Sequence, residues 1–258
     1  MFKNSIIACC NLFCLLAGCM PACAFSAGNV FDEGQWLVGI VATPEQSVYA
    51  GVKDEVQVIP YIAWETDHWH VGIDKLSYQW VADKDLELEI AAKPRFGSSS
   101  PSSFDPDQMR YETIERDFAL EAGASFQYGV FPLSIEGELL VDVSGTHNGF
   151  SAELILGREV PYQQFELHVA AGLVYTDRRL TQHLYGVTPT QAATGINAYS
   201  PPADLSYTAS IEVTHLLSFR CAVVAQLTAE FAGEAIRMSP LTDRKIGLEG
   251  VFGLIYFF

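Results

Sequence analysis

Six histidines are the residues of this chain best suited to catalysis or metal binding. His68 and His70 are two positions apart, which places both imidazoles on one face of a strand, where they could share a metal ion. Apart from Glu65, Asp67 and Asp74, a third ligand is missing nearby. The sequence therefore predicts no metal site here, although this pair is its best candidate for one.

Two further histidines, His168 and His215, stand alone within stretches that read as strands. A general base needs a nucleophile or a second polar group within hydrogen-bond reach. A lone histidine in a strand is more typical of a lumen or interfacial position. The chain has no G-x-S-x-G elbow, no glycine-rich phosphate loop and no cysteine pair with metal-binding spacing. We therefore expect neither an enzyme nor a bound cofactor.

Carboxylates are the most abundant chemical groups, with 31 Asp and Glu against 15 Lys and Arg and a net charge of −16. A chain this acidic is poorly suited to neutralising a phosphate backbone, so a nucleic-acid partner is excluded. Glu136, Glu138 and Asp142 alternate along one predicted strand, on a single face. We interpret them as part of a solvated, cation-attracting interior rather than as an acid–base pair.

The elements that position these groups follow a period of two. Apolar residues alternate with polar or small ones in segment after segment, the pattern of β-strands with two different faces. No stretch of eighteen apolar residues occurs after residue 24. We count about twelve strands, at 36–40, 56–64, 69–73, 76–80, 86–90, 118–128, 133–143, 150–156, 165–175, 207–213, 219–231 and 246–258.

A soluble β-sandwich would show the same period, but two features favour a membrane barrel. Apolar faces often begin or end on aromatic residues, as in Phe118 with Tyr128 or Phe219 with Phe231, which resembles an aromatic girdle. The opposite faces carry many glutamates, as expected for a wet lumen. The predicted fold is all-β: a single antiparallel transmembrane β-barrel of about 12 strands (10–12), of the outer-membrane type, over residues 25–258.

Connection lengths agree with this topology, because such barrels have short periplasmic turns and long outer loops. The predicted outer connections are 43–55, 74–75, 95–116, 144–149, 177–205 and 232–245. The predicted inner connections are short and lie at 65–68, 82–85, 129–131, 158–163 and 217–218. Tyr185, Gly186 and Val187 lie in the longest outer loop, where they form either a plug or recognition site, or a packing contact at the barrel mouth.

Residues 1–24 read as a secretory signal peptide, with Lys3, the apolar run 5–16 and the triplet Ala22-Cys23-Ala24. Cleavage after Ala24 would leave Cys221 as the only cysteine, so no intramolecular disulfide could form. The competing route is lipidation at Cys19, because Leu16-Ala17-Gly18-Cys19 resembles a lipoprotein box. Both routes export the protein.

The last residues resemble the assembly signal of bacterial outer-membrane barrels, in which glycine, an aromatic residue and a terminal phenylalanine alternate. Gly253, Tyr256 and Phe258 carry this resemblance. It implies insertion into outer-membrane lipid by the barrel-assembly machinery.

Nearly the whole chain after residue 24 resembles the MipA/OmpV family of MltA-interacting outer-membrane proteins. The resemblance rests on the order and spacing of several motifs. His183-Leu184-Tyr185 departs from the paired tyrosines expected before Gly186. The motifs are Trp36-Leu37-Val38-Gly39 with Pro44, Tyr49, Gly51 and Pro60; Leu184-Tyr185-Gly186-Val187-Thr188-Pro189 with Ala198-Tyr199; and Ser239-Pro240-Leu241.

The resemblance implies a non-enzymatic barrel in the Gram-negative outer membrane, acting as a scaffold between a lytic transglycosylase and a peptidoglycan synthase. The alternative function, suggested by the acidic faces, is a small cation-favouring pore or solute channel. A surface adhesin is a third class, which rests only on the long outer loops.

Overall fold

The computed structural model describes residues 5–6, 25–26, 34–50, 54–83, 85–95, 116–192 and 197–258. The predicted signal peptide, residues 1–24, and the lipidation site at Cys19 lie outside the described residues, except for Ser5 and Ile6. These two residues form β1 (Ser5–Ile6), which pairs with β2 (Phe25–Ser26).

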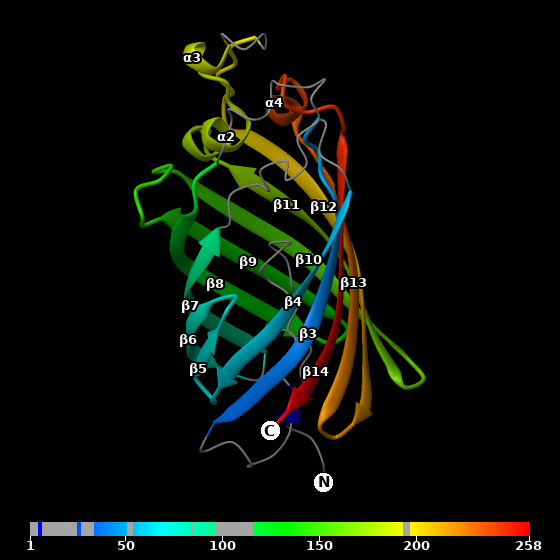
Figure 1. Ribbon diagram of the computed structural model, residues 1–258. Coiled ribbons are helices and arrows are strands. Elements are labelled where there is room, and N and C mark those ends of the chain that lie inside the picture. Colours follow the sequence, from blue (N-terminus) through cyan, green and yellow to red (C-terminus); the bar gives the residue numbers. More distant parts are fainter. Residues whose placement is uncertain are drawn as a thin grey trace.

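Twelve antiparallel strands close into a barrel, in which every strand pairs with its neighbours in sequence and β14 pairs with β3 (Figure 1). The predicted fold class and strand number are confirmed. The strands are β3 (Gln35–Gln46), β4 (Glu55–Glu65), β5 (Trp69–Gly72), β6 (Leu76–Ala82), β7 (Leu86–Arg95), β8 (Ala119–Val130), β9 (Leu133–Asp142), β10 (Phe150–Tyr162), β11 (Phe165–Thr176), β12 (Asp204–Ser218), β13 (Cys221–Phe231) and β14 (Ile246–Phe257).

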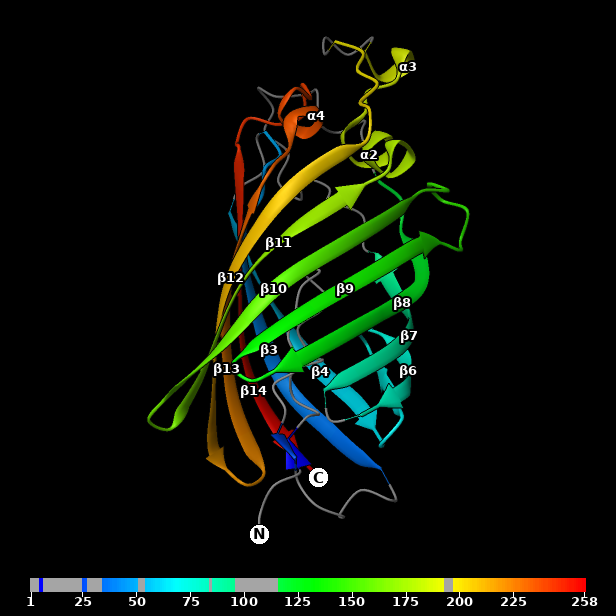
Figure 2. The same cartoon turned by 180° about the vertical axis from the view of Figure 1, so that it is seen from behind.

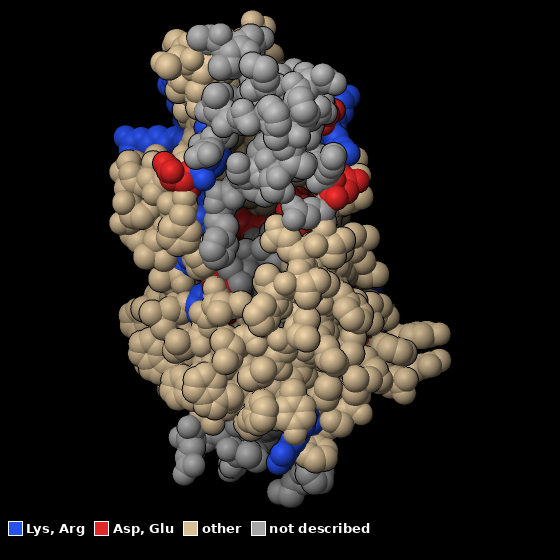
Figure 3. Space-filling model, viewed as in Figure 1, with Lys and Arg blue, Asp and Glu red and all other residues tan. Residues whose placement is uncertain are grey.

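Alternation along each strand separates an apolar outer face from an inner face that is polar over much of the barrel. On β9, Leu133, Ile135 and Leu139 are exposed on the outside, whereas Ser134 and Glu136 are buried inside. The same division runs round the barrel, because successive side chains of a strand point to opposite faces. Much of the lower half of the face drawn in Figure 3 consequently lacks charged side chains.

The two ends of the barrel differ in the way that the sequence predicts. The long connections carry three short helices at one end, α2 (Arg178–Tyr185), α3 (Pro189–Ala192) and α4 (Glu234–Arg237). Both ends of the barrel chain and the short turns lie at the other end (Figures 1 and 2). No helix in the described residues is long and apolar enough to cross a membrane.

One hairpin is longer than predicted. The inner connection expected at 158–163 is a two-residue turn at 163–164, because β10 continues to Tyr162 and pairs with β11 up to Tyr162↔Phe165. The sequence suggests a turn here because it contains Arg158, Glu159 and Pro161. However, β9 pairs with β10 only as far as Arg158, so the last residues of β10 form an edge on that side. A proline is tolerated where a strand runs along an edge.

Another hairpin is shorter than its neighbours. β5 has four residues and β6 has seven, and they meet in a turn at 73–75. β5 pairs only with Ala63, Trp64 and Glu65 of β4, so the turn lies partway up the barrel wall. The sequence predicts both strands but places this turn among the outer connections.

Candidate functional sites in the lumen and the outer loops

Ion pairs cross the inner face of the barrel from β7 to β8 and β9. Lys93 of β7 donates to Glu138 Oε1 of β9, and Arg95 Nε of β7 donates to Glu121 Oε1 of β8 at 2.8 Å. His147 Nε2 lies 3.1 Å from the same Glu121 oxygen. Pairing compensates the cost of burying these charges. The inner face therefore carries a network of ion pairs, in which Lys93 and Arg95 neutralise part of the excess negative charge.

A second buried network lies beside the short hairpin. His70 stands between two carboxylates, with Nδ1 2.7 Å from Glu65 Oε1 and Nε2 3.0 Å from Asp74 Oδ1. All three side chains are at most 8% exposed. Lys75, the next residue in the turn, donates to Glu89 of β7 at 2.7 Å. These contacts attach the β5–β6 turn to the inner wall on both sides.

Two of the three predicted lumen acids point inward, and the third organises a loop. Glu136 accepts a hydrogen bond from Ser134 Oγ at 3.0 Å, and Glu138 pairs with Lys93. Asp142, at the outer end of β9, accepts hydrogen bonds from the backbone N–H groups that follow it, including His147 at 2.6 Å and Asn148 at 2.7 Å. Its carboxylate thus shapes the turn at 143–149.

The candidate histidines do not converge on a common centre. His68 is exposed in the turn before β5, and its Nδ1 lies 3.2 Å from Gln79 O, whereas His70 is buried. His168 is buried on the inner face, 3.5 Å from Ser134 Oγ. His215 lies near the end of β12, 3.0 Å from Gln164 O. Within the described residues, no three His, Cys, Asp or Glu side chains are grouped so as to hold a metal ion.

The Tyr185-Gly186-Val187 motif joins three outer loops. Tyr185 ends α2 and stacks on Tyr49, with ring centroids 5.3 Å apart, and its carbonyl accepts a hydrogen bond from Ser239 Oγ at 2.7 Å. Val187 pairs with Tyr199 and is buried against Leu241.

Gly186 completes this contact because its position leaves no room for a side chain. A Cβ here would lie 2.5 Å from Gln182 O, the carbonyl that accepts the capping hydrogen bond from Gly186 N–H at 3.0 Å. Arg116 Nη2 donates to Gly186 O at 2.8 Å. Burial raises the pKa of the Tyr185 hydroxyl well above its usual value. These contacts favour a packing contact at the barrel mouth over a plug or recognition site. A role of the motif as a plug or recognition site stays a prediction.

Asp177 fixes the start of α2. Its carboxylate accepts hydrogen bonds from the backbone N–H of Leu180 at 3.0 Å and of Phe150 at 2.9 Å. Burial acts to raise the pKa of Asp177, but these bonds and a third from Arg179 N–H outweigh it and hold the pKa below its usual value.

The predicted assembly signal lies on the last strand. Tyr256 and Phe258 are exposed on the outer side, with an edge-to-face contact of 4.8 Å between ring centroids, while Gly253 faces inward opposite Val41 of β3. Recognition of these residues during assembly stays a prediction.

Sequence reasoning missed the lumen cations. Lys93 and Arg95 lie two positions apart at the end of a strand, which is the spacing of two residues on one face. This signal was available in the sequence. Their partners were not, since Glu138 is 45 residues from Lys93 and is reached only through the register of two intervening strand pairs.

Comparison with known families and proteins adds independent information. The family model described as "MltA-interacting protein MipA" matches residues 38–258. The outer membrane protein YiaT of Escherichia coli, in strains K12 and O157:H7, is 23% identical over 226 residues, which cover 86% of this chain and 90% of YiaT.

Among solved structures, the COG4313 outer membrane channel of Pseudomonas putida F1 aligns with 87% of this chain and 95% of its own, at 9% identity and a TM-score of 0.49. OmpT of Vibrio cholerae aligns with 88% of this chain and 97% of its own, at 7% identity and a TM-score of 0.40.

Proposed function

The chain belongs to the MltA-interacting protein MipA family and is a β-barrel of the outer membrane, and we propose that it is a non-enzymatic scaffold for murein-processing enzymes. The family description names MltA as an interaction partner. In this proposal the first partner is a lytic transglycosylase, the class of enzyme that the family resemblance implies. A peptidoglycan synthase would bind the same assembly.

The observation that carries this proposal is the overhanging tip of the β10–β11 hairpin, residues 159–166. Short periplasmic turns offer little surface to a partner, but this tip extends beyond the end of β9 and stands clear of the neighbouring turns (Figure 2). The Glu159 N–H donates to Pro132 O at 2.8 Å, which anchors its base. Tyr162 is 58% exposed, so the tip presents an aromatic anchor of the kind that interfaces use.

Site-specific cross-linking in cells tests the scaffold. A photo-cross-linking amino acid replaces Gln163 at the tip, and the matched control replaces Asn148 at the opposite end of the barrel. Both are exposed turn residues with positive φ, 56° and 52°, so the two replacements impose similar backbone strain. We expect an adduct with the lytic transglycosylase, identified by its antibody, from position 163 only. Equal adducts from both positions, or none from 163, would count against docking of the transglycosylase at the β10–β11 tip.

A small cation-favouring channel is the second candidate, and the inner face favours it. Glutamates that point inward from β8, β9, β12 and β14 outnumber the lysines and arginines that point inward from the described strands. They are Glu121, Glu136, Glu138, Glu212 and Glu249, against Lys93 and Arg95. An acidic conduit raises the local concentration of cations.

Single-channel recording with a salt gradient tests this second function. Replacing Glu136 and Glu138 by glutamine should lower the cation preference seen in the reversal potential, because Lys93 then loses its carboxylate. The control is Arg158→Gln, since Arg158 points outward from β10. Silence from a folded wild-type barrel would eliminate the channel and leave the scaffold untouched.

A further inference from the structure

All four tryptophans of the chain lie on one side of the barrel. Trp36, Trp64, Trp69 and Trp80 belong to four neighbouring strands, β3, β4, β5 and β6. Trp36, Trp69 and Trp80 are exposed. The aromatic girdles of such barrels run round the wall, and their indole rings lie at the level of the lipid head groups. The outer wall over β3–β6 therefore differs from the other strands, whose aromatic residues are Phe and Tyr.

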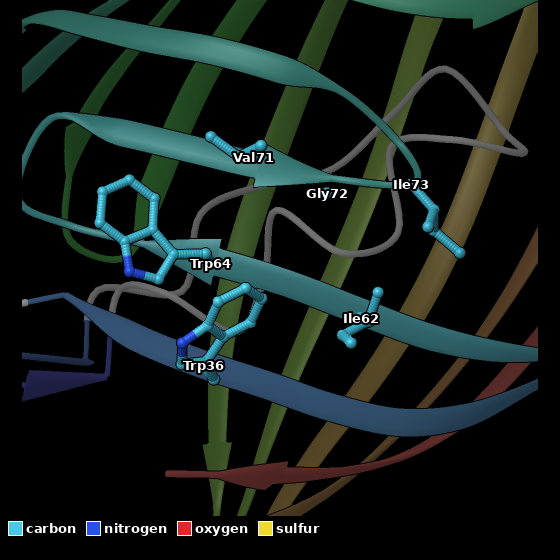
Figure 4. Close-up of a pocket in the computed structure, with 6 residues that line it drawn as sticks. All are labelled: Trp36, Ile62, Trp64, Val71, Gly72 and Ile73. Atoms are coloured by element: carbon cyan, nitrogen blue, oxygen red, sulfur yellow. The ribbon is translucent and has the colours of Figure 1, made fainter.

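An apolar pocket of about 400 Å³ opens on this side of the wall (Figure 4). In the strand register, Trp64 lies opposite Trp36 on one side and opposite Val71 on the other. Pockets that hold small ligands are roughly 300–1,000 Å³ and mostly apolar, so this one has a suitable size and character. Its lining consists of Trp36, Ile62, Trp64, Val71, Gly72 and Ile73.

Gly34, the residue before β3, sets the position of the Trp64 ring. A Cβ on Gly34 would lie 2.5 Å from Trp64 Nε1, so the ring packs directly against the glycine backbone. The φ of Gly34 is +84°, in the left-handed region that favours glycine. Figure 4 shows the ring on the side of the pocket away from Ile62 and Ile73. The hollow lies between them.

The inner side of the same wall is fixed by the buried network around His70. Gly72 lines the pocket, and a Cβ on this residue would overlap Asp74 Oδ1. Tyr61, which faces inward from β4, donates to the same Asp74 oxygen at 3.4 Å. His70 is held between Asp74 and Glu65. Because these contacts hold the backbone behind the pocket, we infer that the pocket is largely preformed.

Lipid is the surrounding medium of this pocket. The outer wall of an outer-membrane barrel faces hydrocarbon, and the lining contains no charged side chain. A hollow left empty would forfeit the dispersion contacts of its lining. The turn 66–68 joins β4 to β5 at the end of the barrel that carries the short turns, and Asp67 and His68 are exposed there. A chain in the pocket can thus keep its head group beside a polar turn.

From this arrangement we propose that the pocket is a binding site for one acyl chain of a phospholipid in the periplasmic leaflet. The chain lies between the two indoles and the side chains of Ile62 and Ile73, and the head group lies at the level of the turn 66–68. This inference goes beyond the scaffold function and does not depend on it.

Tryptophan quenching tests the site, because the chain supplies its own reporters. In the double variant Trp69→Phe and Trp80→Phe, the two remaining tryptophans, Trp36 and Trp64, both line the pocket. The control has all four tryptophans replaced by phenylalanine and carries Val169→Trp, which faces outward on β11 across the barrel. Each protein, freed of lipid in detergent, is titrated with a phosphatidylethanolamine that carries a dibrominated chain.

We expect quenching of the pocket tryptophans to saturate near equimolar lipid, because one chain fills one site. Quenching in the Val169→Trp control should instead rise steadily with the lipid content of the micelle. The control is matched in depth, since the β10 partner of Val169 is Arg158, which pairs with the first residue of β9. Identical titration curves for the two proteins would overturn the site.

Filling the pocket provides a second test. Val71→Trp places a large ring in the pocket, and Val169→Trp is the same change on the opposite wall, at a residue of similar exposure, 39% against 43%. Native mass spectrometry after extraction into detergent measures the fraction of barrel that retains a phospholipid. We expect this retention to be about tenfold weaker in Val71→Trp, the effect of excluding two methylene groups, and unchanged in Val169→Trp.

The heat-dependent shift in gel mobility verifies that each variant is folded. Ile73→Trp, in the turn rather than in a strand, is a second filling variant should Val71→Trp fail to fold. Equal retention by folded filling variants and by Val169→Trp, or no retained phospholipid on the wild type, would overturn the proposal.

Discussion

At the scale of single residues, the outer loops depend on polar groups that each satisfy several backbone N–H groups. Asp142 and Asp177 both do this, one for the turn 143–149 and one for the start of α2. Loops this long would otherwise leave many backbone groups to water. These two carboxylates therefore fix the backbone of the turn 143–149 and of the start of α2 at the mouth of the barrel.

Asp177 makes the order of α2 dependent on pH. Its folded-state pKa is depressed, so its stabilising contribution is complete above the unfolded-state pKa, near 4, and is lost as pH falls through the lower folded-state value. We expect protection of α2 amides against hydrogen exchange, corrected for intrinsic rates, to be constant from about pH 7 to 5 and to fall below about pH 4.

Two variants separate the contribution of the charge from that of the cap. Asp177→Asn keeps a capping side chain and should remove the acid-dependent loss, whereas Asp177→Ala should cost about 1 kcal/mol of helix stability at neutral pH. An acid-dependent loss that persists in Asp177→Asn would show that another group is responsible.

At the scale of elements, close approach of neighbouring strands sets which residues are tolerated. A Cβ on Gly123 of β8 would lie 1.8 Å from Leu139 O and 3.0 Å from Leu140 Cα, both in the backbone of β9. Backbone atoms cannot turn aside as a side chain can. Glycine at this position therefore permits the pairing of β8 with β9 and the curvature of the wall.

Gly123→Ala should consequently destabilise the barrel by about 1–3 kcal/mol, the cost of overpacking a well-packed site. The measurement is the urea midpoint of unfolding of the refolded barrel in detergent. Unfolding is monitored by the heat-dependent shift in gel mobility that distinguishes folded from unfolded barrel. Ser125→Ala, the next inward position on β8, is the control and should change little. An unchanged midpoint for Gly123→Ala would mean that β9 moves away at no cost.

At the scale of the whole molecule, the period of two predicted the strands, and the aromatic ends of their apolar faces and the glutamates on the opposite faces favoured a membrane barrel over a sandwich. The period assigns each residue to a face, as for Leu133 and Glu136, because successive side chains of a strand alternate. The turn at 163–164 was misplaced because Pro161 is a turn signal that an overhanging edge also accepts. The pairing of Lys93 with Glu138 was not predictable, since it depends on strand register and on how the wall curves.

The height of the β5–β6 turn in the barrel wall escaped prediction for a similar reason. The strands at 69–73 and 76–80 were recognised, but their shortness relative to β4 and β7 becomes meaningful only when the four strands stand side by side. The overhanging β10–β11 tip likewise results from a difference in length between β9 and β10. Both features arise from differences in length between neighbouring strands, which a local sequence pattern does not reveal.

In the proposed scaffold, the overhanging β10–β11 tip docks a periplasmic murein hydrolase. A trimmed hairpin that lacks Val160, Pro161, Glu166 and Leu167 removes two pairs between β10 and β11 and the two pairs that Glu166 and Leu167 make with β12. Because two residues leave each strand, every other residue keeps its face. The direct measurement is a binding titration of a purified lytic transglycosylase against the barrel in nanodiscs. We expect saturable binding to the wild type and binding at least about tenfold weaker to the trimmed barrel. Equal affinity for the two barrels, or no binding to either, would contradict it.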